Sequence, residues 1–376
     1  MMNMLVTFRL SALGFGGTER VFLSIADFLS STYGWQIDFV VDQISGNETE
    51  QIAKAKGYAV VEMDASRTWK TILPFARYLK TRKPGVVLSA YTETNAAALI
   101  SNGLNGFSTP IIITEHNSLD EPWRSNSRLK RFMREAIVRY AYRFSDRVLC
   151  VSRGLAEQIS KKLSHAHISY IHNPTRFSVR TRSKDEARAA LDLKDGVRMI
   201  LAVGRISRQK NYLMMLEAFT SLPASDNNHL YIVGGVYEAA EKKRVDQFIA
   251  EHDIGGQVHF VGFTEDVHLY YEAADLLVLS SAWEGFGNVL VEALGFGLPI
   301  VSSRCNHGPA EILADGEFGI LVDVGDATGM GQAIQKIIEK NPFDPARQIL
   351  RAQAFSESRI GEEYYRLICQ TNGRTA

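Results

Sequence analysis

The 376-residue sequence is poor in cysteine and has no long hydrophobic run. Its three cysteines, Cys150, Cys305 and Cys369, are far apart and form no C-x-x-C pair. This usage excludes a disulfide framework and a cysteine-based zinc site, and it indicates a reducing compartment. The longest uncharged run, 95–114, contains three asparagines, two glycines and a proline, which excludes a membrane-spanning helix. No secretory signal peptide is visible, so we expect a soluble, cytoplasmic protein.

The sequence also lacks a net charge, but its two halves are charged. Residues 1–175 carry 21 Lys+Arg against 15 Asp+Glu, a charge of +6, and the remainder carries 21 against 27, a charge of −6. With 45% hydrophobic and 22% charged residues, the composition is that of a globular protein. The length favours two domains of roughly 150–200 residues, one basic and one acidic.

Short apolar strands alternate with amphipathic helices along the chain. This alternation predicts two parallel sheets covered on both faces, hence an α/β protein with two doubly wound, Rossmann-like domains. The expected strands are Leu5–Leu10, Gln36–Val41, Val86–Ser89, Ile111–Glu115, Arg147–Val151, Met199–Val203, Leu230–Val233, Val258–Val261, Leu276–Leu279 and Ile300–Ser302. The expected helices include Glu19–Leu29, Ser127–Phe144, Tyr212–Ser221 and Glu238–Glu251.

A polar, basic segment interrupts this alternation near the middle of the chain. It has little apolar periodicity until a short helix near Glu186–Leu193. We therefore expect an N-terminal domain at 1–175, a linker at 176–196 and a C-terminal domain at 197–354. The C-terminal helix 355–376 is expected to return to the N-terminal domain. Ligands of such sheets bind beyond the carboxyl ends of the strands, so two facing domains would form a cleft.

The first expected strand ends in a glycine-rich loop, "ALGFGGTER". Gly14, Gly16 and Gly17 precede a helix start, where backbone amides can approach an anion. The G-x-G-x-x-G fingerprint fails, because Glu19 stands where its last glycine belongs. A carboxylate does end the second strand, as a nicotinamide-dinucleotide site requires. A tight turn and a dinucleotide site both remain open for this loop.

Two cations follow the first strand of the second half, in "GRISRQKN". Arg205 and Lys210 lie at a strand-to-helix turn, where cations oppose the helix dipole. An anion between them removes that conflict, and Arg with Lys suits a diphosphate. A solvated basic loop is the plainer alternative.

Two glutamates flank the start of another helix, in "WEGFGNVLVEALGFG". Glu284 precedes a helix that begins near Asn288, and Glu292 lies about one turn inside it. The N–H groups of the first turn can bind phosphate, whereas carboxylates repel phosphate and accept hydrogen bonds from hydroxyls. The spacing therefore suits a nucleotide sugar, with hydroxyl groups on both sides of a diphosphate.

This stretch resembles the E-x7-E signature of retaining glycosyltransferases of family GT4, which have the GT-B fold. Other landmarks occur in order: "GFGGTER", "TEHN", "VLCVSRGL", "IHNPT", "AVGRISRQKN", "IVGG", "VHFVGFTEDV" and "AFSES". The resemblance spans nearly the whole chain. The variant with "GGTERV" and "TPIIITEHN" is similar to transferases that elongate lipid-linked oligosaccharides or surface polysaccharides.

The resemblance implies roles for individual residues. Arg205 and Lys210 would hold the donor diphosphate, Glu284 the transferred sugar and Glu292 the ribose. His116 would face the reacting sugar, and Thr264 would lie near the base. Backbone contacts to sugar and phosphate would come from Gly285, Phe286, Gly287, Asn288 and Val289, and Gly16 and Gly17 would let the N-terminal loop approach the phosphates and the acceptor. The loop "GGVY" departs from the acidic or polar residue usual there, so base contacts in that loop are open.

The expected mechanism needs no metal cofactor. No D-x-D motif stands at a strand end, so Arg205, Lys210 and the helix amides would stabilise the departing diphosphate. The catalytic set is then His116, Glu284, Arg205 and Lys210, with His116 orienting the substrate and an acid–base role open to it. The donor is expected to be a nucleoside-diphosphate sugar, UDP-sugar first.

The segment between Arg124 and Arg147 holds eight basic and two acidic residues beside an apolar stripe. A core-facing helix with a solvated basic face would explain it. The sharper interpretation is docking on anionic lipid at the inner face of the cytoplasmic membrane, where a polyprenyl-diphosphate-linked acceptor would lie. Nucleic acid is not expected, because no recognition motif accompanies the charge. The residues of this expected membrane patch are Arg124, Arg128, Lys130, Arg131 and Arg134.

Other functions remain open at this point. A nucleotide-sugar 2-epimerase shares the expected architecture, and a glycosyltransferase with a soluble small acceptor needs no membrane patch. A nicotinamide-dependent oxidoreductase is disfavoured by Glu19 in the fingerprint. A nucleotide-sugar-binding scaffold without activity would have no need of Arg205, Lys210, Glu284 and Glu292 together.

Overall fold

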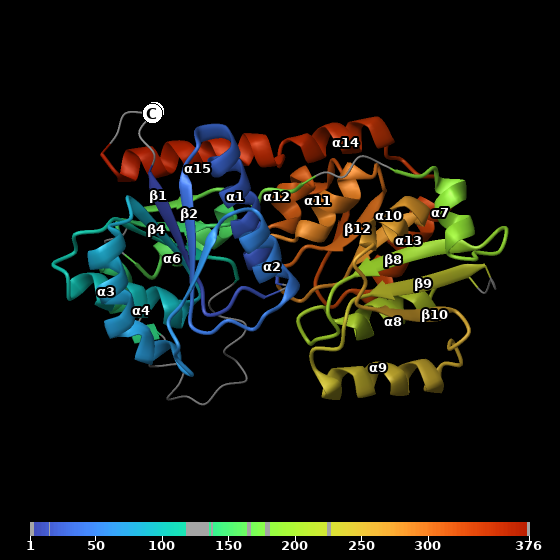
Figure 1. Ribbon diagram of the computed structural model, residues 1–376. Helices are drawn as coiled ribbons and strands as arrows, with labels where there is room; N and C mark the ends of the chain where they lie inside the picture. Colours follow the sequence, from blue (N-terminus) through green and yellow to red (C-terminus); the bar gives the residue numbers. More distant parts are fainter. Residues whose placement is uncertain are drawn as a thin grey trace. The chain divides into compact units, whose positions relative to one another are not determined.

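The computed structural model describes residues 4–14, 16–117, 135–136, 138–163, 167–176, 181–223 and 227–373. The chain divides into two compact units. The first comprises Met1–Arg176 and Ser356–Ala376, and the second comprises Phe177–Phe355. Each unit is an α/β body built on its own parallel sheet (Figure 1).

The first unit contains a seven-stranded parallel sheet in the order β3-β2-β1-β4-β5-β6-β7. Because the chain winds outward in both directions from β1, the strand order reverses between β1 and β4. The loops after these two strands therefore leave the sheet side by side, at the position where doubly wound sheets bind ligands. The strands are β1 (Leu5–Arg9), β2 (Gln36–Val41), β3 (Ala59–Glu62), β4 (Val86–Ala90), β5 (Ile111–Glu115), β6 (Arg147–Cys150) and β7 (Ile168–Tyr170).

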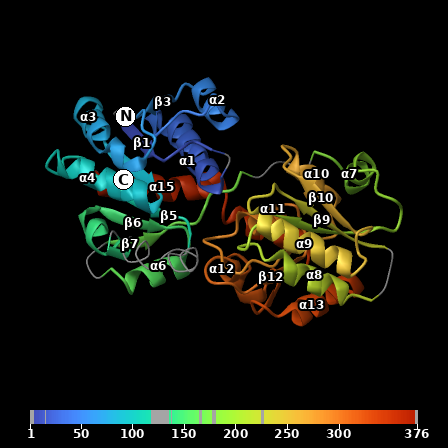
Figure 2. The same cartoon turned by 90° about the horizontal axis from the view of Figure 1, so that it is seen from below.

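Helix α1 (Gly17–Tyr33) packs beside α15 (Glu357–Thr371), although the two are far apart in sequence (Figures 1 and 2). Gly34, at φ +68°, ends α1 in the left-handed conformation that glycine adopts without a steric cost. Buried side chains of β1, β2, α1 and α15 form one apolar core. The other helices of this unit are α2 (Glu48–Ala55), η1 (Thr68–Thr71), α3 (Ile72–Arg82), α4 (Thr92–Gly103), η3 (Tyr142–Phe144) and α6 (Arg153–Ser160).

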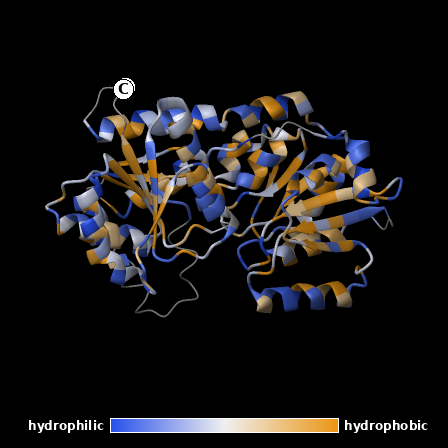
Figure 3. Cartoon of the chain, in the orientation of Figure 1, coloured by the Kyte–Doolittle hydropathy of each residue, from blue (hydrophilic) through white to orange (hydrophobic). Residues whose placement is uncertain are grey.

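The second unit repeats the same winding in a six-stranded sheet, in the order β10-β9-β8-β11-β12-β13. Its order reverses between β8 and β11, so their following loops are again neighbours. The central strands β8 and β11 are mostly apolar, as the orange colour in Figure 3 shows, because helices cover both faces of a doubly wound sheet. The strands are β8 (Arg198–Val203), β9 (Asn228–Val233), β10 (Val258–Gly262), β11 (Leu276–Leu279), β12 (Ile300–Ser303) and β13 (Ile320–Val322).

The helices of the second unit pack in three groups around this sheet. Helix α8 (Tyr212–Thr220) contacts α9 (Ala239–Glu251) and α13 (Ala327–Glu339), and their apolar side chains share a core with the strands. The remaining helices are α7 (Lys184–Ala190), α10 (Val267–Ala273), α11 (Asn288–Gly295), α12 (Pro309–Ile312), η4 (Ala314–Gly316) and α14 (Pro345–Gln353); α11 packs against α12 and α14, and α7 against α10.

The architecture of two Rossmann-like parallel sheets is confirmed, and three strands were not expected. These are β3, β7 and β13, each at an edge of its sheet. They are three or four residues long, and most of their side chains are half-buried or exposed. An edge strand packs less apolar surface, so its sequence carries a weaker hydrophobic signal.

Residues 181–196, which lie in the segment expected to link two domains, are folded into the second unit. They include α7, which begins with a capping box. The side chain of Ser183 accepts from the N–H of Glu186, and the side chain of Glu186 accepts from the N–H of Ser183. Across the part of the chain that the structure describes, every helix is too short or too polar to cross a membrane.

Candidate functional site

The second unit brings the two predicted charged motifs together at its topological switch point. Arg205 and Lys210 lie in the loop after β8, and Glu284 lies in the loop after β11. Since β8 and β11 are neighbours in the sheet, residues that are 74 positions apart meet there.

Lys210 and Glu284 form a direct ion pair. Lys210 Nζ lies 2.6 Å from Glu284 Oε1, and the exposed fractions of the two side chains are 17% and 8%. A pair so nearly enclosed is weakly screened by solvent, so each charge strongly orients the other. The structure thus places a cation and an acceptor for hydroxyl groups side by side at the strand ends.

Further hydrogen bonds hold the Glu284 carboxylate in place. Ser281 Oγ, fully buried, donates to Oε1 at 2.7 Å, and Gln209 Nε2 approaches Oε2 at 3.5 Å. Gln209 also donates to the carbonyl oxygen of Trp283 at 3.1 Å, and its own carbonyl accepts from Ala282 N at 2.8 Å. Hydrogen bonds therefore connect the loops after β8 and β11 around Glu284.

Helix α11 begins directly after this loop. Gly287 is its N-cap at φ +103°, a conformation that glycine supplies readily. The N–H groups of Asn288 and Val289, both half-buried, belong to the first turn, where no carbonyl of the helix itself can accept from them. Phe286 is 2% exposed and packs edge-on against Phe355, so only its backbone can take part in binding.

Gly308 supports the start of this helix from the loop after β12. It has φ +94°, and a Cβ at this position would lie 1.8 Å from the carbonyl oxygen of Phe286. Only glycine allows the two backbones to approach so closely. The Glu284 amide donates to the carbonyl of Asn306 in the same loop at 3.4 Å, so this loop buttresses the segment 284–287.

Glu292 is half-buried on α11, one turn inside the helix. Its Oε2 accepts a hydrogen bond of 2.7 Å from Tyr271 on α10. Burial, with the carboxylate beside it, keeps the pKa of Tyr271 far above its ordinary value, so the phenol remains a donor. Within the described ranges no partner occupies Glu292 Oε1, which is therefore an acceptor that is held in place and still open.

Arg205 is exposed, and its guanidinium stacks on an aromatic ring. The centre of the guanidinium lies 4.3 Å from the centroid of Tyr237, which is 65% exposed. Tyr237 N donates to the carbonyl of Ile206 at 3.1 Å, so the loop after β9 is fastened to the loop that carries Arg205. Tyr237 thus limits the directions in which Arg205 can point.

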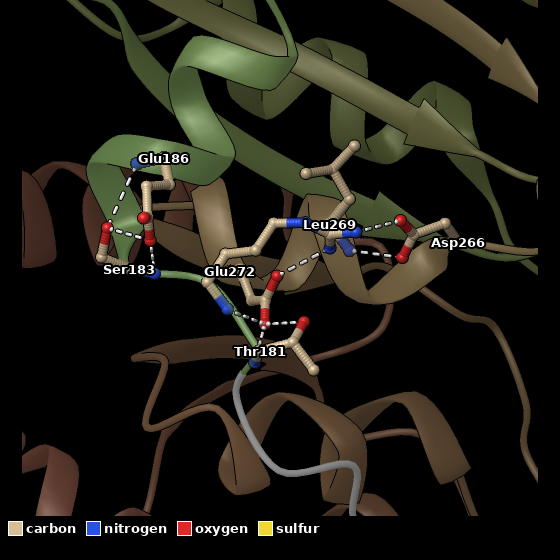
Figure 4. Close-up of polar contacts among 7 residues, drawn as sticks. Thr181, Ser183, Glu186, Asp266, Leu269 and Glu272 are labelled. Carbon is tan, nitrogen blue, oxygen red and sulfur yellow. Dashed lines mark hydrogen bonds and ion pairs between the residues drawn. The ribbon is translucent and has the colours of Figure 1, made fainter.

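Thr264 lies half-buried in the loop between β10 and α10. Its Oγ1 accepts a hydrogen bond of 3.2 Å from the backbone N–H of Asp266. Asp266 is in turn the N-cap of α10, because its side chain accepts from the N–H of Leu269 at 3.2 Å. Asp266 pairs with Arg182 at 2.9 Å, and buried Glu272 accepts from Thr181 and Arg182 (Figure 4).

This cluster has its own charge balance. Burial alone would raise the pKa of Glu272, but its hydrogen bonds to Thr181 and Arg182 bring it below the ordinary value. The Thr264 loop is consequently anchored to the segment that enters the unit.

In the first unit, His116 directly follows β5. The half-buried ring lies edge-on to Phe22 at 5.7 Å, and its Nε2 is 3.0 Å from Thr114 Oγ1. Burial lowers the pKa of His116 to about 3, so the imidazole is neutral at physiological pH. A neutral ring suits the role of orienting a substrate better than that of donating a proton.

Glu115, the residue before His116, was not among the expected site residues. It is buried and accepts hydrogen bonds from Tyr142 and, at 3.4 Å, from Asn95. Burial raises the pKa of Glu115 to about 7, against the opposing effect of those two hydrogen bonds. The same network ties β5 to α4 and η3 just beneath His116.

The carboxylates of Asp38, within β2, and Asp42, directly after it, are both engaged within the protein. Asp38 accepts from Arg82 at 3.0 Å and from Tyr78 at 2.7 Å. Asp42 accepts from Thr68 at 2.6 Å and forms an ion pair with buried Arg9. Neither is left for a ribose, which removes the carboxylate that a dinucleotide site requires.

The expected membrane patch lies outside the described residues. All five of its members fall within the range 118–134, namely Arg124, Arg128, Lys130, Arg131 and Arg134.

Two family models match the chain, and together they cover most of it. Residues 15–177 match the model described as Glycosyltransferase Family 4, and residues 183–356 match Glycosyl transferases group 1. The chain is a family 4 glycosyltransferase. The expected resemblance is thereby confirmed, and the oxidoreductase alternative is excluded.

Curated relatives of this glycosyltransferase carry transferase names. A Campylobacter jejuni protein, 26% identical over 98% of this chain and 99% of its own, is named an alpha-1,4-N-acetyl-D-galactosaminyltransferase for a diNAcBac-PP-undecaprenol-linked GalNAc disaccharide. Another from the same organism, 26% identical over 94% and 96%, is named for N-acetylgalactosamine-N,N'-diacetylbacillosaminyl-diphospho-undecaprenol. The lipopolysaccharide core glycosyltransferase LpsE of Rhizobium meliloti is 30% identical over 60% of this chain and 65% of its own.

Solved structures share the fold of this family 4 enzyme. HepE of Anabaena, determined in complex with UDP, superposes with a TM-score of 0.83 at 17% identity and covers 98% of this chain and 100% of its own. The lipopolysaccharide glycosyltransferase WaaG superposes with a TM-score of 0.74 at 18% identity over 96% and 99%. The fold is GT-B.

Several residues that shape the site were missed in the sequence. Gln209 and Ser281 lie within the two motifs, and their polar side chains beside Lys210 and Glu284 were the available signal. Tyr271 and Gly308 gave no signal, because each acts through a contact with a distant segment. For Tyr237, the motif "GGVY" pointed to the right loop but not to the stacking on Arg205.

Proposed function

We propose that this glycosyltransferase moves a sugar from a nucleoside-diphosphate sugar, a UDP-sugar first, to a polyprenyl-diphosphate-linked oligosaccharide. The observation that carries the donor assignment is the Lys210–Glu284 pair beside the start of α11. A cation and helix amides suit the diphosphate, and a carboxylate suits the hydroxyls of the attached sugar. The complexes of HepE with UDP and with UDP-glucose support a uridine donor.

The acceptor assignment rests on the curated relatives. Two of them, aligned over nearly their whole length, are named for diphospho-undecaprenol-linked substrates. An acceptor anchored in lipid requires the enzyme to work at a membrane surface, so we place it peripherally on the cytoplasmic face. The basic residues Arg128, Lys130 and Arg131 of the sequence would supply electrostatic attraction to anionic lipid.

The transfer proceeds with retention of the anomeric configuration. The acceptor hydroxyl attacks the anomeric carbon on the face that the diphosphate leaves, so one C–O bond forms while the bond to phosphate oxygen breaks. The proton passes from the attacking hydroxyl to an oxygen of the departing diphosphate. Arg205, Lys210 and the first turn of α11 stabilise the charge of that leaving group, and no bound metal is needed.

His116 and Glu292 hold substrate without taking part in bond exchange. The imidazole of His116, with its pKa lowered to about 3 by burial, orients a sugar hydroxyl as a neutral group. Glu292, fixed by Tyr271, accepts from the ribose. Hydroxyl recognition on both sides of the diphosphate makes the site selective for the whole donor.

A panel assay tests this function. The purified protein is incubated with UDP- and GDP-sugars, with and without a lipid-linked oligosaccharide, and with and without a chelator. We expect nucleoside diphosphate to be released, with glycosylated acceptor of retained configuration, in the presence of chelator. Loss of turnover on chelation would contradict the metal-free mechanism, and an epimerised free sugar formed without acceptor would identify a 2-epimerase instead.

A further inference from the structure

The switch point of the first sheet contains a buried carboxylate that no expected role accounts for. Glu19 lies in the first turn of α1, after the glycine loop of β1, and is 7% exposed. Tyr91 is the first residue after β4, the strand next to β1. Tyr91 Oη donates to Glu19 Oε1 at 2.6 Å, so the two neighbouring strand ends are joined through this hydrogen bond.

Tyr91 is held in an unusual backbone conformation. Its φ is +74°, which a bulky residue rarely adopts, and its carbonyl accepts from Asn95 N at 2.8 Å at the start of α4. The half-buried ring packs against the core of the unit. This backbone directs the phenol to the Glu19 carboxylate.

The second oxygen of Glu19 has no hydrogen-bond partner among the described residues. Oε2 is buried, and a carboxylate oxygen without a hydrogen-bond partner in such a place is costly. It lies against the glycine turn, because a Cβ on Gly16 would be 2.3 Å from it. Glycine at position 16 therefore leaves room for the Glu19 carboxylate.

The position of this carboxylate decides what the glycine loop can bind. A phosphate near 4 Å from a carboxylate would be repelled by about 4 kcal/mol per pair of unit charges, at an effective dielectric constant of about 20. A neutral N–H or O–H group, in contrast, would satisfy Oε2. This differs from the expectation that Gly16 and Gly17 approach the donor phosphates.

We propose that Glu19 Oε2 accepts a hydrogen bond from a hydroxyl or acetamido group of a substrate sugar, and that Tyr91 positions the carboxylate for this contact. The carboxylate beside the glycine loop of the first unit then belongs to a sugar subsite. The inference rests on the proposed function for its substrates. The sugar belongs either to the acceptor or to the donor, and both share this chemistry.

A purely structural role for Glu19 needs a matched control. A carboxylate in the first turn stabilises a helix through its dipole, whatever the substrate. Glu357 has the same place on α15, in the same unit, and so Glu357→Gln reports the effect of losing a first-turn charge, together with its contacts to Ser24 and Arg176. Glu19→Gln keeps the shape of the side chain, and Tyr91→Phe removes only the positioning hydroxyl.

Equilibrium binding tests the proposal without requiring turnover. Titration calorimetry would give Kd for UDP, a UDP-N-acetylhexosamine and a short-chain polyprenyl-diphosphate-linked amino sugar, for the wild type and each variant. We expect Glu19→Gln to weaken one of the two sugar ligands about 10-fold or more. Tyr91→Phe should weaken the same ligand less, and Kd for UDP should stay within about twofold. Glu357→Gln should change none of the three.

The outcomes separate the sources and the alternatives. If Glu19→Gln raises Kd for the lipid-linked ligand, the subsite belongs to the acceptor. If it raises Kd for the UDP-sugar more than Kd for UDP, the subsite belongs to the donor. Tighter binding of UDP by Glu19→Gln would indicate an anion site and overturn the proposal, as would unchanged affinity for both sugars. Wild-type turnover in the panel assay judges the proposed function separately.

Discussion

Lys210 and Glu284 meet at 2.6 Å although 74 residues separate them, because the strands that precede their loops are neighbours in the second sheet. The pair is nearly enclosed, and Ser281 and Gln209 hold the same carboxylate. A preformed charge pair needs little reorganisation when a substrate binds, which is the condition under which electrostatic stabilisation is most effective.

Removing the cation should affect activity far more than folding. We expect Lys210→Ala to lower kcat/KM by about 100-fold or more, since a preorganised charge on the leaving group is lost. Glu284 would remain buried without its counter-ion, which should lower the free energy of unfolding by about 2 kcal/mol. The loss is smaller than for an isolated buried pair, because Ser281 still donates a hydrogen bond to the carboxylate. Steady-state kinetics and urea unfolding measure the two effects, with Lys336→Ala as an exposed control.

A second substitution tests the coupling. Glu284→Gln in the Lys210→Ala background should recover part of the lost stability and none of the activity, because it removes the uncompensated charge without restoring the site. Additive stability losses would show that the two charges do not interact.

Gly308 should be essential for the geometry of the donor site. Gly308→Ala would push its Cβ against the Phe286 carbonyl, whereas Gly316→Ala, at φ +111°, meets nothing within 4 Å. We expect the control to cost about 1–2 kcal/mol of stability through its left-handed backbone alone. Gly308→Ala should cost more and also raise KM for the donor. Equal effects of the two variants on thermal unfolding and on KM would contradict this.

Glu115 should make the first unit less stable as pH rises. Its folded-state pKa of about 7 lies above the ordinary value of 4.5, so the folded state binds more protons between these values. The unfolding free energy of the wild type relative to Glu115→Gln should therefore fall by about 3 kcal/mol from pH 4.5 to pH 7. Urea unfolding followed by circular dichroism at several pH values measures this difference. A flat difference would contradict the raised pKa.

Tyr237 should contribute to donor affinity through Arg205. Tyr237→Ala removes the ring that the guanidinium stacks on, and an exposed cation–π contact is worth about 0.5–1 kcal/mol. We expect KM for the donor to rise about two- to fivefold with little change in kcat. Tyr237→Phe keeps the ring and should behave as the wild type. If Tyr237→Phe raised KM for the donor more than Tyr237→Ala does, the hydroxyl group and not the ring would be responsible.

Membrane binding should depend on the basic segment of the N-terminal half. Reversing the charges of Arg128, Lys130 and Arg131 to Glu should abolish co-sedimentation with vesicles containing anionic lipid, since each basic residue near such a surface contributes about 1 kcal/mol. The matched control reverses three exposed lysines of the second unit, Lys243, Lys336 and Lys340. Unchanged binding of the first variant, or equal loss in both, would exclude this surface.

Much of the fold was predictable because inner strands carry a strong local signal. The strands Gln36–Val41, Ile111–Glu115 and Leu276–Leu279 have the bounds predicted from their apolar runs. The edge strands β3, β7 and β13 were missed, since a strand with one neighbour buries less and is shorter. The site motifs were visible for a similar reason: glycines and charges at strand ends interrupt apolar patterns.

The sequence by itself determined the two alternating α/β series, the glycine turns at their strand ends and the charged residues that follow them. These features are local, and each follows from a few consecutive side chains. Only the tertiary structure decided that Lys210 faces Glu284, that Tyr271 fixes Glu292, and that Tyr91 reaches Glu19. The physical reason is that a parallel sheet brings the ends of sequence-distant strands to one edge. Which loops then meet depends on strand order, and no stretch of sequence contains that order.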